Sequence, residues 1–275
     1  MITLTGFADE ISQDLEVQLD VLQSEGISHL ELRNVWGKNV LELTDEEAAR
    51  LKQRLQERGF KLSSIGSPIG KIRITDPFEP HLKSFSRAIE LARYLEAPYI
   101  RIFSFFIPEG EEAGKYEGEV LSRMKLLTEI AEREDVRLLH ENEKHVYGDT
   151  GERCLGILQA CDSPQLRAAF DPANFVQCGV RPMTDAYPLI APYVTYIHIK
   201  DALMESGQVV PAGQGDGELP QLVQELKRRQ YTGFMSLEPH LSAAETFQGY
   251  SRPDLFVVAV RALKKLLADQ QMDWN

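Results

Sequence analysis

Hydrophobic residues recur along the chain in eight short runs, each followed by a longer segment with helical spacing. Most of these runs are nearly continuous rather than alternating, which is typical of strands that are covered on both faces. They lie at residues 2–8, 28–33, 61–67, 99–105, 136–142, 166–171, 194–200 and 234–239. The sequence therefore predicts eight strands in regular alternation with helices.

The intervening segments carry helix signals. Leu15, Leu19 and Leu22 have the spacing of a single helical face. Thr44 and Glu47 form a capping box in front of another apolar stripe, so a helix is expected to begin there.

Eight strand–helix units without a linker or a change in composition predict one α/β domain over residues 1–275, a (β/α)8 TIM barrel. The length of 275 residues is close to the size of about 250 residues that is typical of this fold. An open doubly wound sheet is the alternative. Such a sheet normally has a glycine-rich turn after its first strand, and the GFADEIS segment at residues 6–12 is not one.

The charge and composition of the chain limit the kinds of binding partner and the location that we expect. Acidic residues outnumber basic ones by 42 to 30, and the resulting net charge of −12 disfavours nucleic acid as a partner. The chain contains no apolar run of the roughly 18 residues that a membrane span requires. The N-terminus lacks a basic leader, and the three cysteines lack CxxC spacing, so a reducing cytoplasm is the expected location.

Ligand-type side chains end the last four predicted strands. In order along the chain, they are Glu141, Asp171, His198 and Glu238. The C-terminal ends of barrel strands carry the catalytic groups in TIM-barrel enzymes, so these side chains are expected to converge. Three carboxylates would repel one another unless a cation lay between them. Three oxygens and one nitrogen favour Mn²⁺ or Mg²⁺, with Co²⁺ and Zn²⁺ as alternatives.

Further charged residues are candidates for substrate contacts. Lys200 lies two residues past the strand-seven histidine, and Glu143 lies two residues past the strand-five glutamate. Arg101 is expected to face a substrate anion, to form a buried pair with Glu31 or to be solvated. For Lys200 the alternative is an ion pair, and for Glu143 it is a solvated loop position. Glu31 and Arg33 end the second strand, where a salt bridge is favoured over a role in the pocket.

A glycine-rich segment, GQGDG at residues 213–217, follows the seventh strand. TIM barrels often bind phosphate in this region. Asp216 and Glu218 place negative charge there, so a lid or a tight entry into the next helix is favoured over a phosphate loop.

The motif set resembles the xylose isomerase-like TIM-barrel superfamily of sugar isomerases and epimerases. The motifs that carry the resemblance are HENE (140–143), FDPAN (170–174), YIHIKD (196–201), GQGDG (213–217) and SLEP (236–239). The resemblance implies one divalent metal held by the four strand-end residues named above and a small carbohydrate substrate. It also implies that Glu141 and Glu238 act as acid and base through an enediolate, and it leaves homo-oligomerisation open.

Two departures argue against the ketose 3-epimerase branch of that superfamily. Asn174 stands where that branch has a histidine, and Met204 stands where it has an arginine. Asn174 is then a candidate substrate contact. A branch of DNA-repair endonucleases uses extra histidines, and this chain has only six in all. The alternatives that remain beside an isomerase are a dehydratase acting on a polyol-like ketone, such as an inosose, and a non-catalytic sugar-binding barrel.

Overall fold

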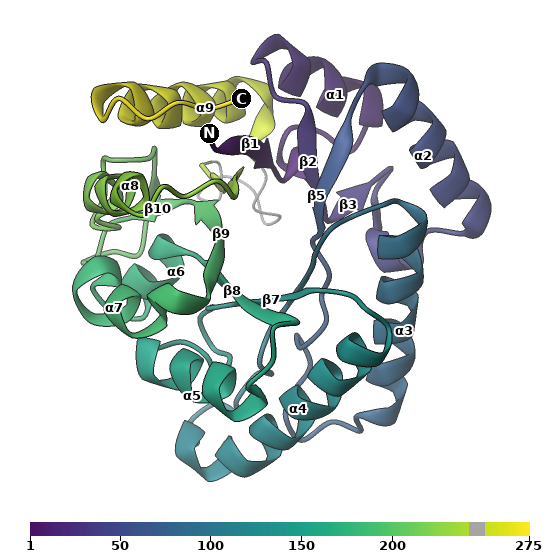
Figure 1. Ribbon diagram of the computed structural model, residues 1–275, viewed down its shortest axis with the longest axis vertical. Helices are drawn as coiled ribbons and strands as arrows, with labels where there is room; N and C mark the ends of the chain where they lie inside the picture. Colours follow the sequence, from purple (N-terminus) through teal and green to yellow (C-terminus); the bar gives the residue numbers. More distant parts are fainter. Residues whose placement is uncertain (242–250) are drawn as a thin grey trace.

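Eight parallel strands form a barrel with helices around its outside in the computed structural model, which describes residues 1–241 and 251–275 (Figure 1). The barrel strands are β1 (Thr3–Gly6), β2 (His29–Leu32), β5 (Lys61–Ile65), β6 (Ile100–Ile102), β7 (Leu138–Glu141), β8 (Leu166–Phe170), β9 (Val194–Ile199) and β12 (Phe234–Leu237). Each lies within one of the eight hydrophobic runs, so the predicted barrel and its strands are confirmed.

The strand order is β1-β12-β9-β8-β7-β6-β5-β2, and every pair in it is parallel. A single bridge between Phe7 and Glu31 joins β1 to β2 and nearly closes the barrel. Ile2 also pairs with Trp274, so both ends of the chain lie together beside β1 (Figure 1).

Nine α-helices cover the barrel within the described ranges. They are α1 (Leu15–Ser24), α2 (Asp45–Arg58), α3 (Glu79–Tyr94), α4 (Glu117–Arg133), α5 (Gly151–Cys161), α6 (Pro172–Gln177), α7 (Tyr187–Ile190), α8 (Leu219–Arg228) and α9 (Arg252–Asp269). The capping box that was predicted at Thr44 and Glu47 begins α2. Leu51 and Leu55 of α2 are buried, while its charged residues face outward, as the apolar stripe predicts.

Two short hairpins extend from the C-terminal ends of barrel strands and were not predicted. The first, β3 (Asn34–Val35) with β4 (Lys38–Asn39), follows β2. The second, β10 (Asp201–Ala202) with β11 (Val209–Val210), follows β9 and leads into the glycine-rich segment. Strands of two residues leave no periodic signal, so the pattern along the sequence could not reveal them.

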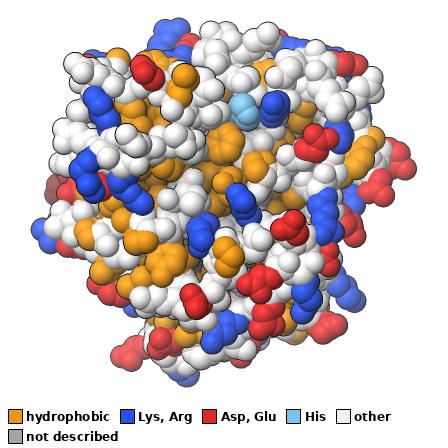
Figure 2. Space-filling view, in the orientation of Figure 1, with side chains coloured by type: hydrophobic (Ala, Val, Ile, Leu, Met, Phe, Trp, Pro, Cys, Tyr) orange, Lys and Arg blue, Asp and Glu red, His pale blue; other side chains and the backbone are white. Residues whose placement is uncertain are grey.

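The molecular surface carries charges of both signs. On the face in Figure 2, Lys and Arg side chains are interspersed with Asp and Glu, and hydrophobic side chains gather toward the centre. Among the described helices, none is both long and apolar enough to cross a bilayer.

One buried histidine holds a turn of the barrel rim. The backbone N–H of Gly70 donates to Nε2 of His81 at 2.7 Å. Gly70 has a φ of +88°, and a Cβ at this position would lie 2.0 Å from the carbonyl oxygen of Phe103, so only glycine fits. Burial, with a smaller contribution from Arg123, lowers the pKa of His81 to about 4.

The protein should lose stability as the pH falls below about 6.5, partly because of His81. An unfolded histidine titrates near about 6.5, whereas folded His81 titrates at about 4. Between these values the unfolded chain binds more protons, so acid favours unfolding. The measurement is the free energy of unfolding at pH 7 and pH 5 for the wild type and H81Q, whose side-chain oxygen can still accept from Gly70. We expect the smaller pH dependence in H81Q, and equal dependence would contradict this origin.

Candidate metal centre

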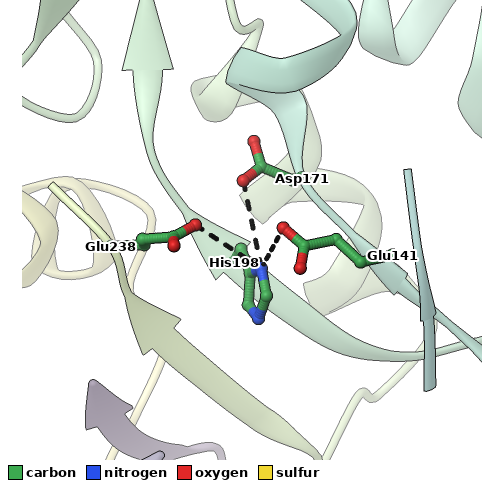
Figure 3. Close-up of side chains that lie close together, drawn as sticks. All are labelled: Glu141, Asp171, His198 and Glu238. Atoms are coloured by element: carbon green, nitrogen blue, oxygen red, sulfur yellow. Dashed lines mark hydrogen bonds and ion pairs between the residues drawn. The ribbon is translucent and has the colours of Figure 1, made fainter. Parts of the chain in front are cut away.

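The four predicted ligand residues lie together at the C-terminal end of the barrel. One ligand atom from each of Glu141, Asp171, His198 and Glu238 lies within 4.8 Å of the others, and all four residues are buried. Glu141 ends β7, His198 belongs to β9, and the other two directly follow β8 and β12. Figure 3 shows Glu141 and Glu238 reaching from opposite sides toward the imidazole of His198.

Local structure orients Asp171. This residue is the N-cap of α6, and its Oδ1 accepts a hydrogen bond from the backbone N–H of Asn174 at 2.9 Å. The second oxygen, Oδ2, is buried and accepts no hydrogen bond from any described residue, and its nearest cation is Nζ of Lys200, 2.9 Å away. The helix start therefore uses one oxygen and directs the other toward the cluster.

The spacing of the cluster fits a small cation. Nδ1 of His198 lies 3.0 Å from Oε1 of Glu141, and 3.9 Å from both Oδ2 of Asp171 and Oε2 of Glu238. Ligands that each lie about 2.0–2.2 Å from one ion are separated by roughly 3–4 Å. This donor set of one imidazole and three carboxylates suits divalent cations.

Charge also favours a cation here. Six carboxylates surround the site among the described residues, against three permanent cations. The carboxylates belong to Asp9, Glu10, Glu31, Glu141, Asp171 and Glu238, and the cations to Arg33, Arg101 and Lys200. A buried surplus of negative charge is costly unless a cation compensates it.

The protein environment separates the pKa values of these carboxyl groups. Burial raises the pKa of Asp171 to about 6. The neighbouring glutamates also raise this pKa, whereas Lys200 lowers it. Burial alone would also raise the pKa of Glu141, but His198 and Arg101 lower it to about 2. In the same way, Lys200 and other cationic neighbours outweigh burial and hold the pKa of Glu238 well below its usual range.

Two of the predicted substrate contacts border Glu141, and three of them, Asn174 included, line the cavity described next. Arg101 and Asn174 both contact Glu141, with Nη1 at 3.0 Å and Nδ2 at 3.3 Å from its carboxylate. Arg101 therefore pairs with Glu141 rather than with Glu31. Lys200 and Glu143 line the cavity described next, and Glu143 also pairs with Lys71 at 3.0 Å. Their roles toward a substrate remain predictions.

A cavity of about 500 Å³ opens beside the cluster. Its lining is rich in amide and charged groups and includes part of the β10–β11 hairpin. The lining residues are Glu143, Lys144, Asn174, Gln177, Lys200, Ser206, Gly207, Gln208, Val209, His240 and Leu241. Two of these lining residues, Asn174 and Lys200, also contact members of the cluster, so the cavity adjoins it.

The sequence did not identify the partners of Glu238. Arg33 donates from Nη1 to Oε1 of Glu238 at 2.7 Å and from Nε to Asp9 at 2.8 Å, which is the salt bridge favoured for this residue. Nε2 of His240 lies 3.3 Å from Glu238, and its Nδ1 lies 3.1 Å from Glu10. This network had two signals in the sequence. Asp9 and Glu10 follow the first hydrophobic run, and His240 lies two residues past Glu238.

The glycine-rich segment encloses an internal carboxylate. Both carboxylate oxygens of buried Asp201 accept hydrogen bonds from backbone N–H groups. Oδ1 accepts from Ala202 at 2.9 Å and from Gly217 at 2.8 Å. Oδ2 accepts from Gly213 at 2.9 Å and from Gly215 at 3.0 Å. These N–H groups are therefore not directed at a phosphate, which agrees with the favoured alternative of a tight loop before α8.

A family model described as xylose isomerase-like TIM barrel matches residues 19–266. The chain belongs to the xylose isomerase-like TIM-barrel family. This family is mostly enzymatic and includes epimerases, isomerases and dehydratases. A search of curated proteins found none that matches this sequence.

Solved structures of the same fold are distant in sequence. A D-tagatose 3-epimerase-like protein is 17% identical, with a TM-score of 0.78 and coverage of 98% of each chain. The IOLI protein with a bound zinc atom is 17% identical, with a TM-score of 0.74, covering 98% of this chain and 97% of that one. The probable 3-DHS dehydratase AsbF from Bacillus anthracis is 17% identical, with a TM-score of 0.73, covering 96% and 99%. At this identity the likeness shows the fold alone.

Proposed function

We propose that this member of the xylose isomerase-like family is a divalent-metal-dependent isomerase or epimerase of a small hydroxylated carbonyl compound. The observation that carries the proposal is the placement of two glutamates, Glu141 and Glu238, on opposite sides of His198 in one buried cluster (Figure 3). Reactions of this class remove a proton beside a carbonyl and return it to the opposite face or to the adjacent carbon.

Glu141, Asp171, His198 and Glu238 would hold the metal. When bound, a divalent ion supplies Lewis acidity that polarises a carbonyl and stabilises negative charge on oxygen. Mn²⁺ or Mg²⁺ is the ion we propose, because three of the four donors are carboxylates.

The two glutamates would carry the proton. Arg101 beside Glu141, and Arg33 with Lys200 beside Glu238, keep both carboxylates ionised and therefore able to accept a proton. A glutamate that has accepted a proton on one side of the substrate becomes the acid for the reverse step. The glutamate on the other side returns a proton to the substrate only after it has itself taken one up from solvent.

A carbohydrate fits the cavity best. Its lining offers amides, a hydroxyl and ammonium groups, which suit a molecule rich in hydroxyls. Asp201 already occupies the backbone N–H groups of the glycine-rich loop, so a phosphorylated substrate is not favoured. A cytoplasmic location and homo-oligomerisation stay predictions.

Lys200 favours a dehydratase as the second candidate. Its ammonium group borders the cavity and lies 2.9 Å from Asp171 and 3.1 Å from Glu238. Such a donor can protonate a departing hydroxyl group after the same initial proton abstraction. The probable dehydratase AsbF has this fold as well.

Turnover in D₂O tests the proposal. The Mn²⁺-loaded protein should incorporate solvent deuterium into a ketose or inosose beside the carbonyl, because the proton taken by a glutamate exchanges with solvent. Mass spectrometry of the recovered compound gives the readout, and protein treated with a chelator is the control. Loss of water from the compound would select the dehydratase instead. Binding without either change across a broad panel would contradict both enzymes.

A further inference from the structure

A buried carboxylate lies directly behind His198, on the side away from the candidate metal centre. Glu31 lies in β2 with only 1% of its surface exposed, and its Oε2 lies 3.2 Å from Nε2 of His198. The other ring nitrogen, Nδ1, is the one that faces Glu141, Asp171 and Glu238. The imidazole therefore stands between the cluster and a further acid.

The position of Glu31 is fixed by other side chains from across the barrel. Its Oε2 accepts hydrogen bonds from Oγ of Ser236 at 2.7 Å and from the hydroxyl of Tyr196 at 2.9 Å. That hydroxyl also contacts Oγ of Ser63 at 2.9 Å, and Ser63 contacts Thr5 at 2.8 Å. A polar chain in the barrel interior thus holds the carboxylate at one place.

The ring of His198 is held as well. Phe7 packs edge-on against it, with ring centroids 5.3 Å apart and an interplanar angle of 73°. With the ring in this orientation, Nε2 faces Glu31 at 3.2 Å without forming a hydrogen bond among the described residues, and Nδ1 faces the cluster, 3.0 Å from Oε1 of Glu141.

The charge of Glu31 is otherwise uncompensated. Among the described residues, no lysine or arginine forms a salt bridge with it, and His198 is its only ionic contact. A buried carboxylate without a nearby cation costs stability. A cation on Nδ1 would supply the missing positive charge through the imidazole.

We propose that Glu31 is a positioning residue for the metal centre. When a cation is bound at Nδ1, Glu31 would accept the remaining Nε2 proton of His198 and hold the ring with Nδ1 toward the cation. The proposal rests on the proposed metal centre and adds to it a residue that does not itself contact the ion. Carboxylates that hold a ligating histidine in this way typically change metal affinity by about 10–100-fold.

Titration of Mn²⁺ into the purified protein tests the assignment. We expect E31Q and E31D to bind Mn²⁺ about 10–100-fold more weakly than wild type, because one lacks the charge and the other shortens the side chain. S64A is the matched control, since Ser64 is also buried, in β5, and within the described part of the chain its hydroxyl donates to the backbone carbonyl of Ile65. It should bind Mn²⁺ as wild type does. Two variants are used so that one can fail to fold without ending the test.

A second readout separates positioning from general stability. In the Mg²⁺-loaded wild type, nuclear magnetic resonance of ¹⁵N-labelled histidine should show the His198 proton on Nε2 and none on Nδ1. A proton on Nδ1, or unchanged Mn²⁺ affinity in folded E31Q and E31D, would overturn the role of Glu31 and leave the metal centre standing. Failure of wild type to bind Mn²⁺, Mg²⁺, Co²⁺ or Zn²⁺ would overturn both.

Discussion

Replacing Glu238 with glutamine should lower turnover by about 10²–10⁴-fold, the usual cost of losing a general acid or base. Glutamine keeps the shape of the side chain but cannot accept a proton and is a weaker metal ligand. Glu141→Gln should have a similar effect, because the two glutamates share the proton transfer from opposite sides of His198 (Figure 3). Steady-state kinetics with saturating Mn²⁺ give the measurement, since excess metal compensates for weakened binding.

A control variant and a binding measurement show whether the loss of turnover comes from the loss of proton transfer. Glu129→Gln changes an exposed glutamate of α4 and should leave turnover unchanged. Substrate binding to E238Q, followed by thermal shift, should persist, because the cavity lining remains in place. Near-wild-type turnover in either E141Q or E238Q would show that the assignment of the proton-transfer pair is wrong.

Replacing Asp201 with alanine should reduce the free energy of unfolding by about 3 kcal/mol or more. The carboxylate accepts hydrogen bonds from four backbone N–H groups, those of Ala202 and of the three glycines of the loop. Alanine would leave these donors without an acceptor, and each buried donor that loses its partner costs about 1–3 kcal/mol. Chemical denaturation of the two proteins provides the comparison.

A neighbouring aspartate is the matched control. Asp216 lies in the same loop but is exposed, and it accepts one hydrogen bond, from the backbone N–H of Met204 at 2.7 Å. Asp216→Ala should therefore cost about 1 kcal/mol or less. Equal destabilisation by both substitutions would contradict the idea that the enclosed carboxylate holds the loop.

The sequence alone determined the barrel and the composition of its candidate site. Near-continuous hydrophobic runs identify strands buried on both faces, and all eight were found where the runs lie. Parallel strands of a barrel end at one rim, so residues that end successive strands must lie near one another. This is why Glu141, Asp171, His198 and Glu238 could be grouped without a structure.

Only the tertiary structure decided which side chains act on that group. Arg33 and Glu238 are 205 positions apart in the chain, and Ser236 and Glu31 are also 205 apart, yet both pairs are hydrogen-bonded. The choice of Glu141 as the partner of Arg101 depended equally on side-chain direction. Periodicity tells which face of a strand a residue occupies, but it carries no information about which distant side chain meets it across the barrel.

In the glycine-rich segment, too, the sequence determined one part of the structure and tertiary contacts determined the other. Its sequence predicted either a lid or a tight entry into the next helix rather than a phosphate loop, because Asp216 and Glu218 place negative charge there. That the loop closes around the carboxylate of Asp201 follows from the return of the β10–β11 hairpin, which brings residues 213–217 back to the end of β9. Local sequence preferences set the conformations that a segment can adopt, whereas contacts between distant segments select the one that is realised.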